Sequence, residues 1–283
     1  MADQSYLSIY AKSFNWAGFF LPKETYLKCS ALYDFCRVAD NIADSNETID
    51  IKKIKFLDFQ NNFNNQKFDD PIIKNMWQLI NEFNISLKVV HDLLDGINSD
   101  IQKNIKLNKK KDLLLYSYRV AGTVGLMMAK ILRVNKKSSL KSAIDLGIAM
   151  QLTNISRDVV EDLNFGRSYI NLNFEEIKST IRLSEIYYEN SLYSIKQIPF
   201  TFRFAILVAR RVYRKIGQKI IKKKNLENYK KSGKIYVSNI EKIIETLLSI
   251  FDLIKLSLIS KDDDNIEHDH DLINEEINLN ERI

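Results

Sequence analysis

Glycine and proline are scarce in this chain, which has only 8 Gly and 3 Pro among 283 residues. β-sandwiches and βαβ arrays need frequent turns, and such turns depend largely on these two residues. The scarcity argues against both architectures and favours an all-α protein. Apolar residues make up 45% of the chain, enough for a sizeable core. No linker or short-period repeat interrupts the sequence, so we expect a single domain.

Cysteines and long apolar runs are also lacking. Cys29 and Cys36 are seven residues apart in one predicted helix, where two helical turns hold them about 10 Å apart, too far for a disulfide. No stretch of about 20 apolar residues is present, so the sequence predicts no membrane-spanning helix. Because no signal peptide is recognisable, we expect a cytoplasmic protein with reduced thiols.

Acidic residues concentrate at the C-terminus. Residues 261–283 hold 9 Asp and Glu against 2 Lys and Arg, a net charge of −7. Residues 1–260 then hold 40 Lys and Arg against 27 Asp and Glu, a net charge of +13. We expect 1–260 to form the folded domain and 261–283 to be a solvated, disordered tail. A basic body suits an anionic substrate, an anionic lipid surface or nucleic acid.

Much of the positive charge lies between Arg203 and Lys234, where 12 Lys and Arg accompany a single acid, Glu227. Two interpretations stay open: a solvated helix face, or peripheral contact of residues 203–234 with anionic membrane lipid. No nucleic-acid-binding motif accompanies the charge, so we expect no nucleic-acid partner.

Hydrophobic periodicity and capping signals predict a succession of helices. Helix starts are marked by Pro22, Asp70–Pro71 and Ser86. A helix pair at 111–133 contains small residues such as Gly125, which permit close approach of backbone to backbone or to a ligand. The expected helices are 22–45, one within 46–68, 71–83, 86–105, the pair at 111–133, 139–163, 182–197, 201–230 and 239–259. The last begins after Ser238, and its apolar residues recur at the spacing of a buried face: Ile240, Ile243, Ile244, Leu247, Leu248, Phe251, Ile254 and Leu258.

Three polar side chains recur every four residues in the predicted helix 139–163. Asn154, Asp158 and Asp162 fall within an arc of about 80° on one helix face, each about 6 Å from the next. Like charges four residues apart destabilise a helix unless something cationic lies between them. Arg157 supplies one positive charge beside these carboxylates. The pattern indicates a further cation, for which another helix face would have to supply more ligands.

The predicted helix 22–45 supplies that second wall. Tyr33, Arg37, Asp40 and Asp44 lie within about 60° of one another on its helical wheel. Carboxylate oxygens are suitable ligands for Mg²⁺, and the arginine guanidinium group binds phosphate through two hydrogen bonds. One such face is more often a solvated helix surface. Two of them, each with an arginine, predict a diphosphate site bridged by Mg²⁺.

Four blocks of residues resemble the squalene/phytoene synthases, enzymes that join two prenyl diphosphates head to head. They are KSF at Lys12–Phe14, LYDFCRVADNIAD at Leu32–Asp44, YSYRVAGTVGLMM at Tyr116–Met128 and QLTNISRDVVEDLNFGRSYI at Gln151–Ile170. The resemblance covers about residues 5–255 and looks most like the bacterial phytoene synthases. It implies an isoprenoid-synthase-type helical bundle, in one domain, around a central cavity.

The resemblance also implies roles for individual residues. Tyr116 matches a cavity tyrosine implicated in the rearrangement and joins Tyr33, Arg37 and Arg157 as a catalytic candidate. The implied cofactor is Mg²⁺, with Mn²⁺ as a possible substitute. Its ligands would be Asp40, Asp44, Asn154, Asp158 and Asp162, and the diphosphate contacts would be Lys12, Ser13, Tyr33, Arg37, Arg157, Tyr213 and Lys234.

One position departs from the family pattern. The first aspartate motif usually reads DDxxD, whereas Asn41 stands here in place of its second Asp. Neighbouring residues on a helix point about 100° apart, so the stripe of Asp40 and Asp44 survives. We expect Asn41 to change the properties of the metal site without abolishing the activity of the enzyme.

The implied reaction joins two geranylgeranyl diphosphates into phytoene, for carotenoid biosynthesis. An allylic cation from the first molecule is attacked by the alkene of the second, and proton loss closes the cyclopropane of prephytoene diphosphate. A second ionisation, rearrangement and proton loss follow. Alternatives are a farnesyl diphosphate enzyme making squalene, dehydrosqualene or presqualene diphosphate, and a non-catalytic family member acting as an assembly factor. We expect a monomer or weak dimer.

Overall fold

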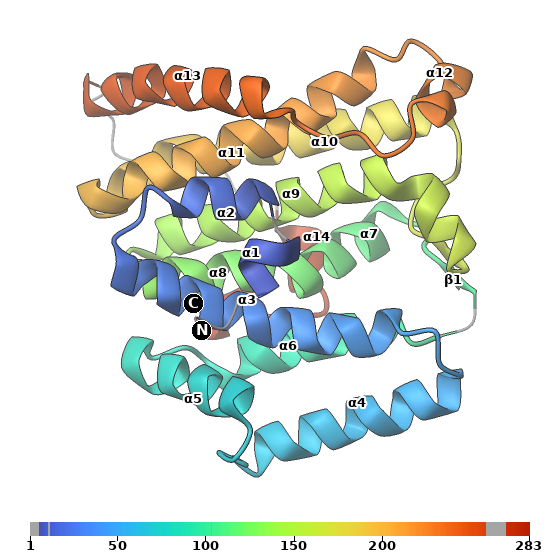
Figure 1. Ribbon diagram of the computed structural model, residues 1–283, viewed down its shortest axis with the longest axis vertical. Helices are drawn as coiled ribbons and strands as arrows, with labels where there is room; N and C mark the ends of the chain where they lie inside the picture. Colours follow the sequence, from blue (N-terminus) through green and yellow to red (C-terminus); the bar gives the residue numbers. More distant parts are fainter. Residues whose placement is uncertain (1–5, 11, 103, 259–269) are drawn as a thin grey trace.

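The all-α architecture is confirmed by the computed structural model, which describes residues 6–10, 12–102, 104–258 and 270–283 (Figure 1). Its only described strands are the two-residue β1 (Ile105–Lys106) and β2 (Arg167–Ser168). The α-helices are α1 (Tyr6–Tyr10), α2 (Lys12–Gly18), α3 (Lys23–Asp44), α4 (Ile49–Asn64), α5 (Pro71–Phe83), α6 (Leu87–Ser99), α7 (Lys110–Ser117), α8 (Thr123–Ile131), α9 (Lys137–Asn164), α10 (Phe174–Leu192), α11 (Phe200–Ile221), α12 (Leu226–Lys231), α13 (Asn239–Leu258) and α14 (Asp271–Asn274).

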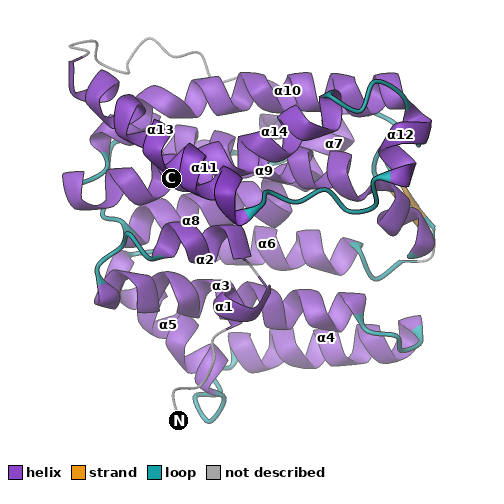
Figure 2. Cartoon of the chain, turned by 45° about the horizontal axis from the view of Figure 1, so that its top comes forward, coloured by secondary structure: helices purple, strands orange, loops and turns teal. Residues whose placement is uncertain are grey.

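Helix α9 runs through the middle of the bundle (Figures 1 and 2). It packs against α10 and α11 on one side and α8 on the other, while α13 lies outside on α11. Helices α4 and α5 form the opposite edge of the molecule. The site helices α3 and α9 therefore lie inside the bundle, where their polar stripes face the interior rather than solvent.

Helix starts followed the capping signals closely. Helix α3 begins directly after Pro22, and the Asp70 carboxylate accepts a hydrogen bond from the backbone N–H of Ile72 at 2.8 Å at the start of α5. The Ser238 hydroxyl likewise accepts from the N–H of Glu241 at the start of α13. Local side-chain chemistry was enough to place these boundaries.

Three boundaries differ from the prediction. Helix α6 ends at Ser99 instead of continuing to residue 105, and α10 begins at Phe174 instead of 182. The predicted helix 201–230 is divided into α11 and α12 by a turn in which Lys224 has a positive φ of 69°. Because such turns depend on tertiary context rather than on a glycine, periodicity could not reveal this one.

A π-helical segment, Tyr118–Gly122, joins α7 to α8 within the predicted helix pair. Beside it, α8 and α9 approach backbone to backbone, as the small residues indicated. A methyl group on Gly147 would collide with the carbonyl oxygen of Ala121, and one on Gly125 would collide with that of Ala143. The two glycines therefore set the distance of α9 from the π-helical segment and from α8, all of which line the cavity described below.

Gly147→Ala is expected to lower the free energy of unfolding by about 2–3 kcal/mol, because neither backbone can yield to the added methyl group. Alanine is the better helix former, so an intrinsic propensity effect would have the opposite sign. Urea unfolding followed by circular dichroism measures the difference, with Ser257→Ala on the exposed surface of α13 as the control. An unchanged or raised stability would show that the helices separate easily.

The orientation of α13 was predicted wrongly. Its apolar stripe faces outward: Ile240, Phe251 and Leu258 are 72%, 67% and 79% exposed, and the other members of the stripe are exposed as well. The opposite face, which holds Lys242, Glu245 and Ser249, is buried. Acids of α13 form ion pairs with cations of α11 in this orientation. Periodicity predicts that a helix has an apolar face but not that this face is inside.

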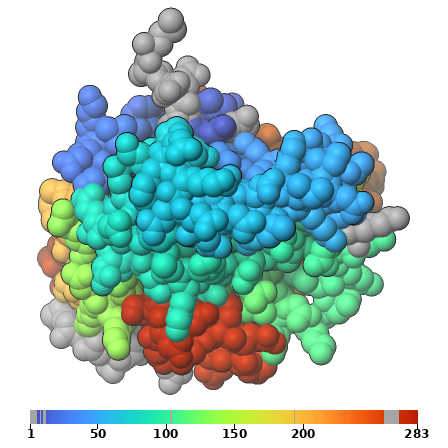
Figure 3. Space-filling view, turned by 90° about the horizontal axis from the view of Figure 1, so that it is seen from below, coloured from blue at the N-terminus to red at the C-terminus, as the bar shows by residue number. Residues whose placement is uncertain are grey.

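The acidic C-terminus also differs from the prediction. Residues 259–269 lie outside the described part of the chain, but residues 270–283 fold back onto α6 and α7 (Figure 3, red). Ile273 and Leu279 are fully buried, and Arg282 makes two hydrogen bonds to the Asp92 carboxylate, at 2.9 and 3.1 Å. A disordered tail is therefore wrong for 270–283, where sparse apolar residues anchor an otherwise acidic segment.

None of the described helices combines the length and apolar character needed to cross a bilayer.

Candidate active site

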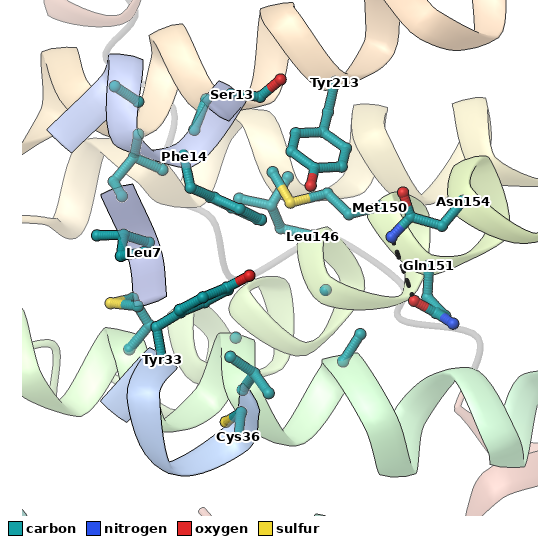
Figure 4. A pocket seen from close by; sticks show the side chains of 18 of the residues that line it. Leu7, Ser13, Phe14, Tyr33, Cys36, Leu146, Met150, Gln151, Asn154 and Tyr213 are labelled. Atoms are coloured by element: carbon teal, nitrogen blue, oxygen red, sulfur yellow. Dashed lines mark hydrogen bonds between the residues drawn. The ribbon is translucent and has the colours of Figure 1, made fainter. Parts of the chain in front are cut away.

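A cavity of about 990 Å³ opens between α2, α3, α8, α9 and α11. Apolar side chains such as Phe14, Leu146 and Met150 line its interior (Figure 4). All but one of the predicted site residues line the same cavity: Lys12, Ser13, Tyr33, Arg37, Asp40, Asp44, Asn154, Arg157, Asp158, Asp162, Tyr213 and Lys234. Segments more than 200 residues apart in the sequence thus meet at one site, which combines a charged region with an apolar chamber.

Helix α3 forms the first wall. Its residues Tyr33, Arg37, Asp40 and Asp44 follow one another along the cavity, as the helical wheel predicted. Asn41 is not among the lining residues, which agrees with its expected direction away from the acidic stripe. Burial raises the pKa of the Tyr33 hydroxyl, so this phenol stays protonated and able to donate a hydrogen bond at neutral pH.

Helix α9 forms the facing wall. The Asp158 carboxylate accepts two hydrogen bonds from Arg157, from Nε at 2.8 Å and from Nη2 at 2.5 Å. The Asn154 amide donates to Gln151 at 3.4 Å, while its buried Oδ1 has no hydrogen-bond partner (Figure 4). An unsatisfied oxygen beside two carboxylates is costly unless a ligand or cation engages it.

Two carboxyl groups of the site hold their protons unusually well. Burial, followed by the nearby charge of Asp44, raises the pKa of Asp40 to about 7. Burial, followed by the charge of Asp158, raises the pKa of Asp162 to about 7. Each pair of like charges on its own helix wall resists full ionisation when no compensating cation is close. The site is therefore electrostatically incomplete in the free protein.

The walls do not converge into a ready-made metal site. Over the described parts of the chain, no three Asp, Glu, His or Cys side chains lie close enough together to hold an ion by themselves. The carboxylates line opposite sides of a shared space instead. Such an arrangement suits Mg²⁺, which commonly binds through one or two carboxylates, water and the phosphate oxygens of a substrate.

Arg167 is a site residue that the sequence did not single out. Its Nη1 donates to the Asp44 carboxylate at 2.7 Å, and its Nη2 donates to the backbone carbonyl oxygens of Ala43 and Asp100. Pairing of β1 with β2 holds it there, through a hydrogen bond from the N–H of Ile105 to the carbonyl oxygen of Gly166. Gly166 and Arg167 lie within the sequence block Gln151–Ile170, but Asp44, the partner of Arg167, lies 123 residues away.

Tyr116 lies outside the cavity, contrary to prediction. Its hydroxyl donates to Asp100 at 2.8 Å and contacts the hydroxyl of Tyr169 at 2.9 Å, and the two rings stack 4.5 Å apart. Tyr169 also donates to Asp100, at 2.6 Å. Tyr116, Tyr169 and Asp100 therefore form a cluster next to Arg167, which donates a hydrogen bond to the backbone carbonyl oxygen of Asp100. In this position Tyr116 can support the cavity wall from outside, and its side chain is not among those that line the cavity.

The cationic side of the site comes from several elements. Lys234, in the segment before α13, approaches Glu161 at 2.5 Å and Asp158 at 3.5 Å. Glu161, which also lines the cavity, is thus the ion-pair partner of this lysine. Tyr213 of α11 packs its ring 4.8 Å from that of Phe14, and burial raises its pKa to about 12. Figure 4 shows Tyr33 and Tyr213 directed into the space between the walls.

The basic stretch 203–234 is largely neutralised inside the fold. Arg211 pairs with Asp252 at 2.5 Å, Lys215 with Glu245 at 3.1 Å, and Lys219 with Glu241 at 2.7 Å. All three acids belong to α13. Arg210, Arg214, Lys231 and Lys234 also lie in ion pairs. Its positive charge therefore acts mainly within the protein, and most of the stretch is not a free cationic face.

Together these features define a helical protein that binds an amphiphile, with a charged region for an anionic head and an apolar chamber for a long tail. Residues 8–173 match the squalene/phytoene synthase family. A 15-cis-phytoene synthase of Enterobacter agglomerans is 29% identical over 247 residues, which cover 76% of this chain and 83% of that protein.

The similarity to solved structures agrees with the family match. A dehydrosqualene synthase in complex with a ligand superimposes with a TM-score of 0.73 at 26% identity, over 89% of this chain and 95% of that chain. A squalene synthase from Alicyclobacillus acidocaldarius shares the fold, with a TM-score of 0.65 at 16% identity over 78% of this chain and 90% of its own. The chain belongs to the squalene/phytoene synthase family and is a prenyltransferase that condenses prenyl groups head to head.

Proposed function

We propose that this enzyme condenses two geranylgeranyl diphosphates to phytoene, through prephytoene diphosphate, in carotenoid biosynthesis and with Mg²⁺ as cofactor. The observation that carries the proposal is the pair of walls, α3 and α9, which bring acids and an arginine each to opposite sides of one largely apolar cavity. The relatives that match over most of the chain are named phytoene synthases, which favours the C20 substrate.

The residues present fit a divalent cation. Asp40 and Asp162 carry raised pKa values, and the Oδ1 of Asn154 is buried without a partner. Oxygen donors alone suit Mg²⁺, and also Mn²⁺. Asp40, Asp44, Asn154, Asp158 and Asp162 would hold the metal, which when bound would neutralise the diphosphate and favour its departure as an anion.

The chain's own residues would bind and orient the diphosphates. Arg37 and Arg157 are cations on the two walls, and Lys12 and Lys234 add positive charge at other points of the same cavity. Tyr33 stays neutral because burial raises its pKa, so its hydroxyl is available as a donor to a phosphate oxygen. Ser13 and Tyr213 offer further hydroxyl groups in the same region.

The apolar chamber would protect the reaction from water. A carbocation beside bulk water is captured at once, so the wall around it must be apolar and exclude water. Phe14, Leu146 and Met150 provide such a surface, and the Phe14 ring supplies an electron-rich face. The volume of about 990 Å³ lies at the upper end of ordinary ligand pockets, which favours two long chains in one chamber.

A second candidate uses farnesyl diphosphate. It is favoured by the similarity to a solved dehydrosqualene synthase, whose fold matches over 89% of this chain. The two candidates differ only in the length of chain that the chamber accepts, because the site for the diphosphates would be the same.

Incubation of the purified enzyme with Mg²⁺ and either geranylgeranyl or farnesyl diphosphate tests both candidates. We expect the C20 substrate to give phytoene, identified by chromatography and mass spectrometry, and the C15 substrate to turn over at least about tenfold more slowly, because it leaves part of the apolar wall uncovered. Reactions with EDTA serve as controls. A clear preference for farnesyl diphosphate would establish the second candidate, and no product from either substrate would refute both.

A further inference from the structure

The outer face of α13 is the largest run of exposed apolar side chains on one described element. Nine of its 20 residues are exposed Ile, Leu or Phe: Ile240, Ile243, Ile244, Leu247, Leu248, Ile250, Phe251, Ile254 and Leu258. They follow one side of a helix about 30 Å long. Leaving so much apolar surface in water is unfavourable, and contiguous patches of this kind mark binding surfaces.

The helix is held to the body by its polar face. Glu241, Glu245 and Asp252 bind cations of α11, and Thr246 accepts a hydrogen bond from the indole of Trp16 at 2.9 Å. This arrangement is the reverse of an ordinary surface helix, which buries its apolar stripe. With these contacts on the polar face, the apolar face of α13 is turned outward.

We propose that the outer face of α13 docks on a lipid bilayer, lying in its interface parallel to the membrane. Figure 1 shows α13 at the outer edge of the molecule, with α11 beneath it, and its apolar side chains are exposed from Ile240 to Leu258. A helix with a continuous apolar face and a polar face has the form that such binding requires.

Charges beside the helix fit an anionic lipid surface. Lys222, Lys224 and Lys230 are exposed and have no ion-pair partner among the residues that the structure describes. They belong to α12 and the turn before it, which lie along the same edge as α13 in Figure 1. These free lysines, rather than the paired cations of α11, can meet lipid phosphates.

Docking through α13 would bring the active-site cavity close to the lipid, which suits the chemistry of the family. Asn239 and Lys242, at the beginning of α13, line the cavity, so the proposed membrane face adjoins the wall of the active site. Long prenyl chains and a hydrocarbon product partition into lipid. The segment that follows α13 in the sequence, residues 259–269, contains five acids and only two apolar residues, a composition poorly suited to pairing with an apolar helix face.

Sedimentation with lipid vesicles tests the proposal. The vesicles are phosphatidylcholine alone or mixed with phosphatidylglycerol, and the full chain is used. The variant Leu247→Gln/Ile254→Gln removes two apolar side chains that are 55% and 51% exposed. The matched control is Ile54→Gln/Leu57→Gln on α4, where the side chains are 61% and 56% exposed at the opposite edge.

We expect the wild type and the α4 control to bind the mixed vesicles, and the α13 variant to bind at least about tenfold more weakly. All three should turn over detergent-solubilised substrate alike, so vesicle binding is read separately from the proposed reaction. Equal binding of both variants, or no binding of the wild type, would overturn the proposal. So would a wild-type dimer in analytical ultracentrifugation that only the α13 variant dissociates, because the face would then join two copies of this chain.

Discussion

Asp158→Asn is expected to lower kcat by about a thousandfold or more while the protein stays folded. The carboxylate lines the cavity between Arg157 and Lys234, and asparagine keeps its size but removes its charge. If Asp158 holds the metal as proposed, loss of its charge removes several kcal/mol of transition-state stabilisation, and about 4 kcal/mol corresponds to a thousandfold in rate. Steady-state kinetics with saturating Mg²⁺ measure the effect, alongside the unfolding temperature.

The two kinetic constants should respond differently. Arg157 loses its negative partner in the variant, and Lys234 loses the more distant of its two acids while keeping Glu161. The site becomes more positive, so its attraction for the anionic substrate increases. We therefore expect KM to stay level or to fall while kcat collapses, which indicates an interaction used in the transition state. A rise in KM with unchanged kcat would instead assign Asp158 to ground-state binding.

Asp252→Asn is a matched control for this experiment. Asp252 also accepts two hydrogen bonds from an arginine, Arg211, and its side chain is 15% exposed, the same as that of Asp158. It does not line the cavity. We expect a comparable change in stability with nearly unchanged turnover. If both variants lost activity equally, disruption of an ion pair, rather than loss of a metal ligand, would explain the first result.

The sequence predicted well which side chains share each helix face of the site, because each of the two acidic stripes lies within a single helix. Spacings of three, four and seven residues fix which side chains share a helix face, whatever the remainder of the fold does. That the two faces would meet followed from the resemblance, and the structure brings Asp40 and Asp158 to one cavity. Their chemical roles stay predictions, which the variants above test.

The parts that the sequence did not predict depend on contacts between distant segments. Arg167 reaches Asp44 only because β1 and β2 pair, and two-residue strands have no periodicity to detect. Tyr116 lies in a block that resembles the family, but its side chain is directed toward Asp100 and Tyr169 rather than into the cavity. The buried Ile273 and Ile277 of the C-terminal segment were visible at helical spacing, yet the surrounding acids suggested a solvated tail.

The raised pKa values of Asp40 and Asp162 make the stability of the metal-free enzyme depend on pH in an unusual direction. Both groups titrate at about 7 in the folded protein, chiefly because of burial, but near their ordinary value of about 3.9 when unfolded. Between about pH 4 and pH 7 the folded state therefore holds more protons. Stability in EDTA is expected to fall as the pH rises through this window, and to level off above it.

Mg²⁺ should reverse that trend, because it binds the ionised carboxylates. At about pH 6 each group is roughly nine-tenths protonated, so apparent affinity should be about a hundredfold weaker than at about pH 8 if both must ionise. Thermal unfolding with and without Mg²⁺ at several pH values measures this directly. The expected result is a rise in Tm at about pH 8 that disappears at about pH 5.5.

The double variant Asp40→Asn/Asp162→Asn separates this linkage from general acid effects. Its amides cannot ionise, so the metal-free protein should be more stable than the wild type at neutral pH, and its Tm should vary less between about pH 4 and pH 7. It should also lose the Mg²⁺-induced rise in Tm. A wild-type rise of equal size at both pH values, or one that persists in the double variant, would place the bound metal away from these two carboxylates.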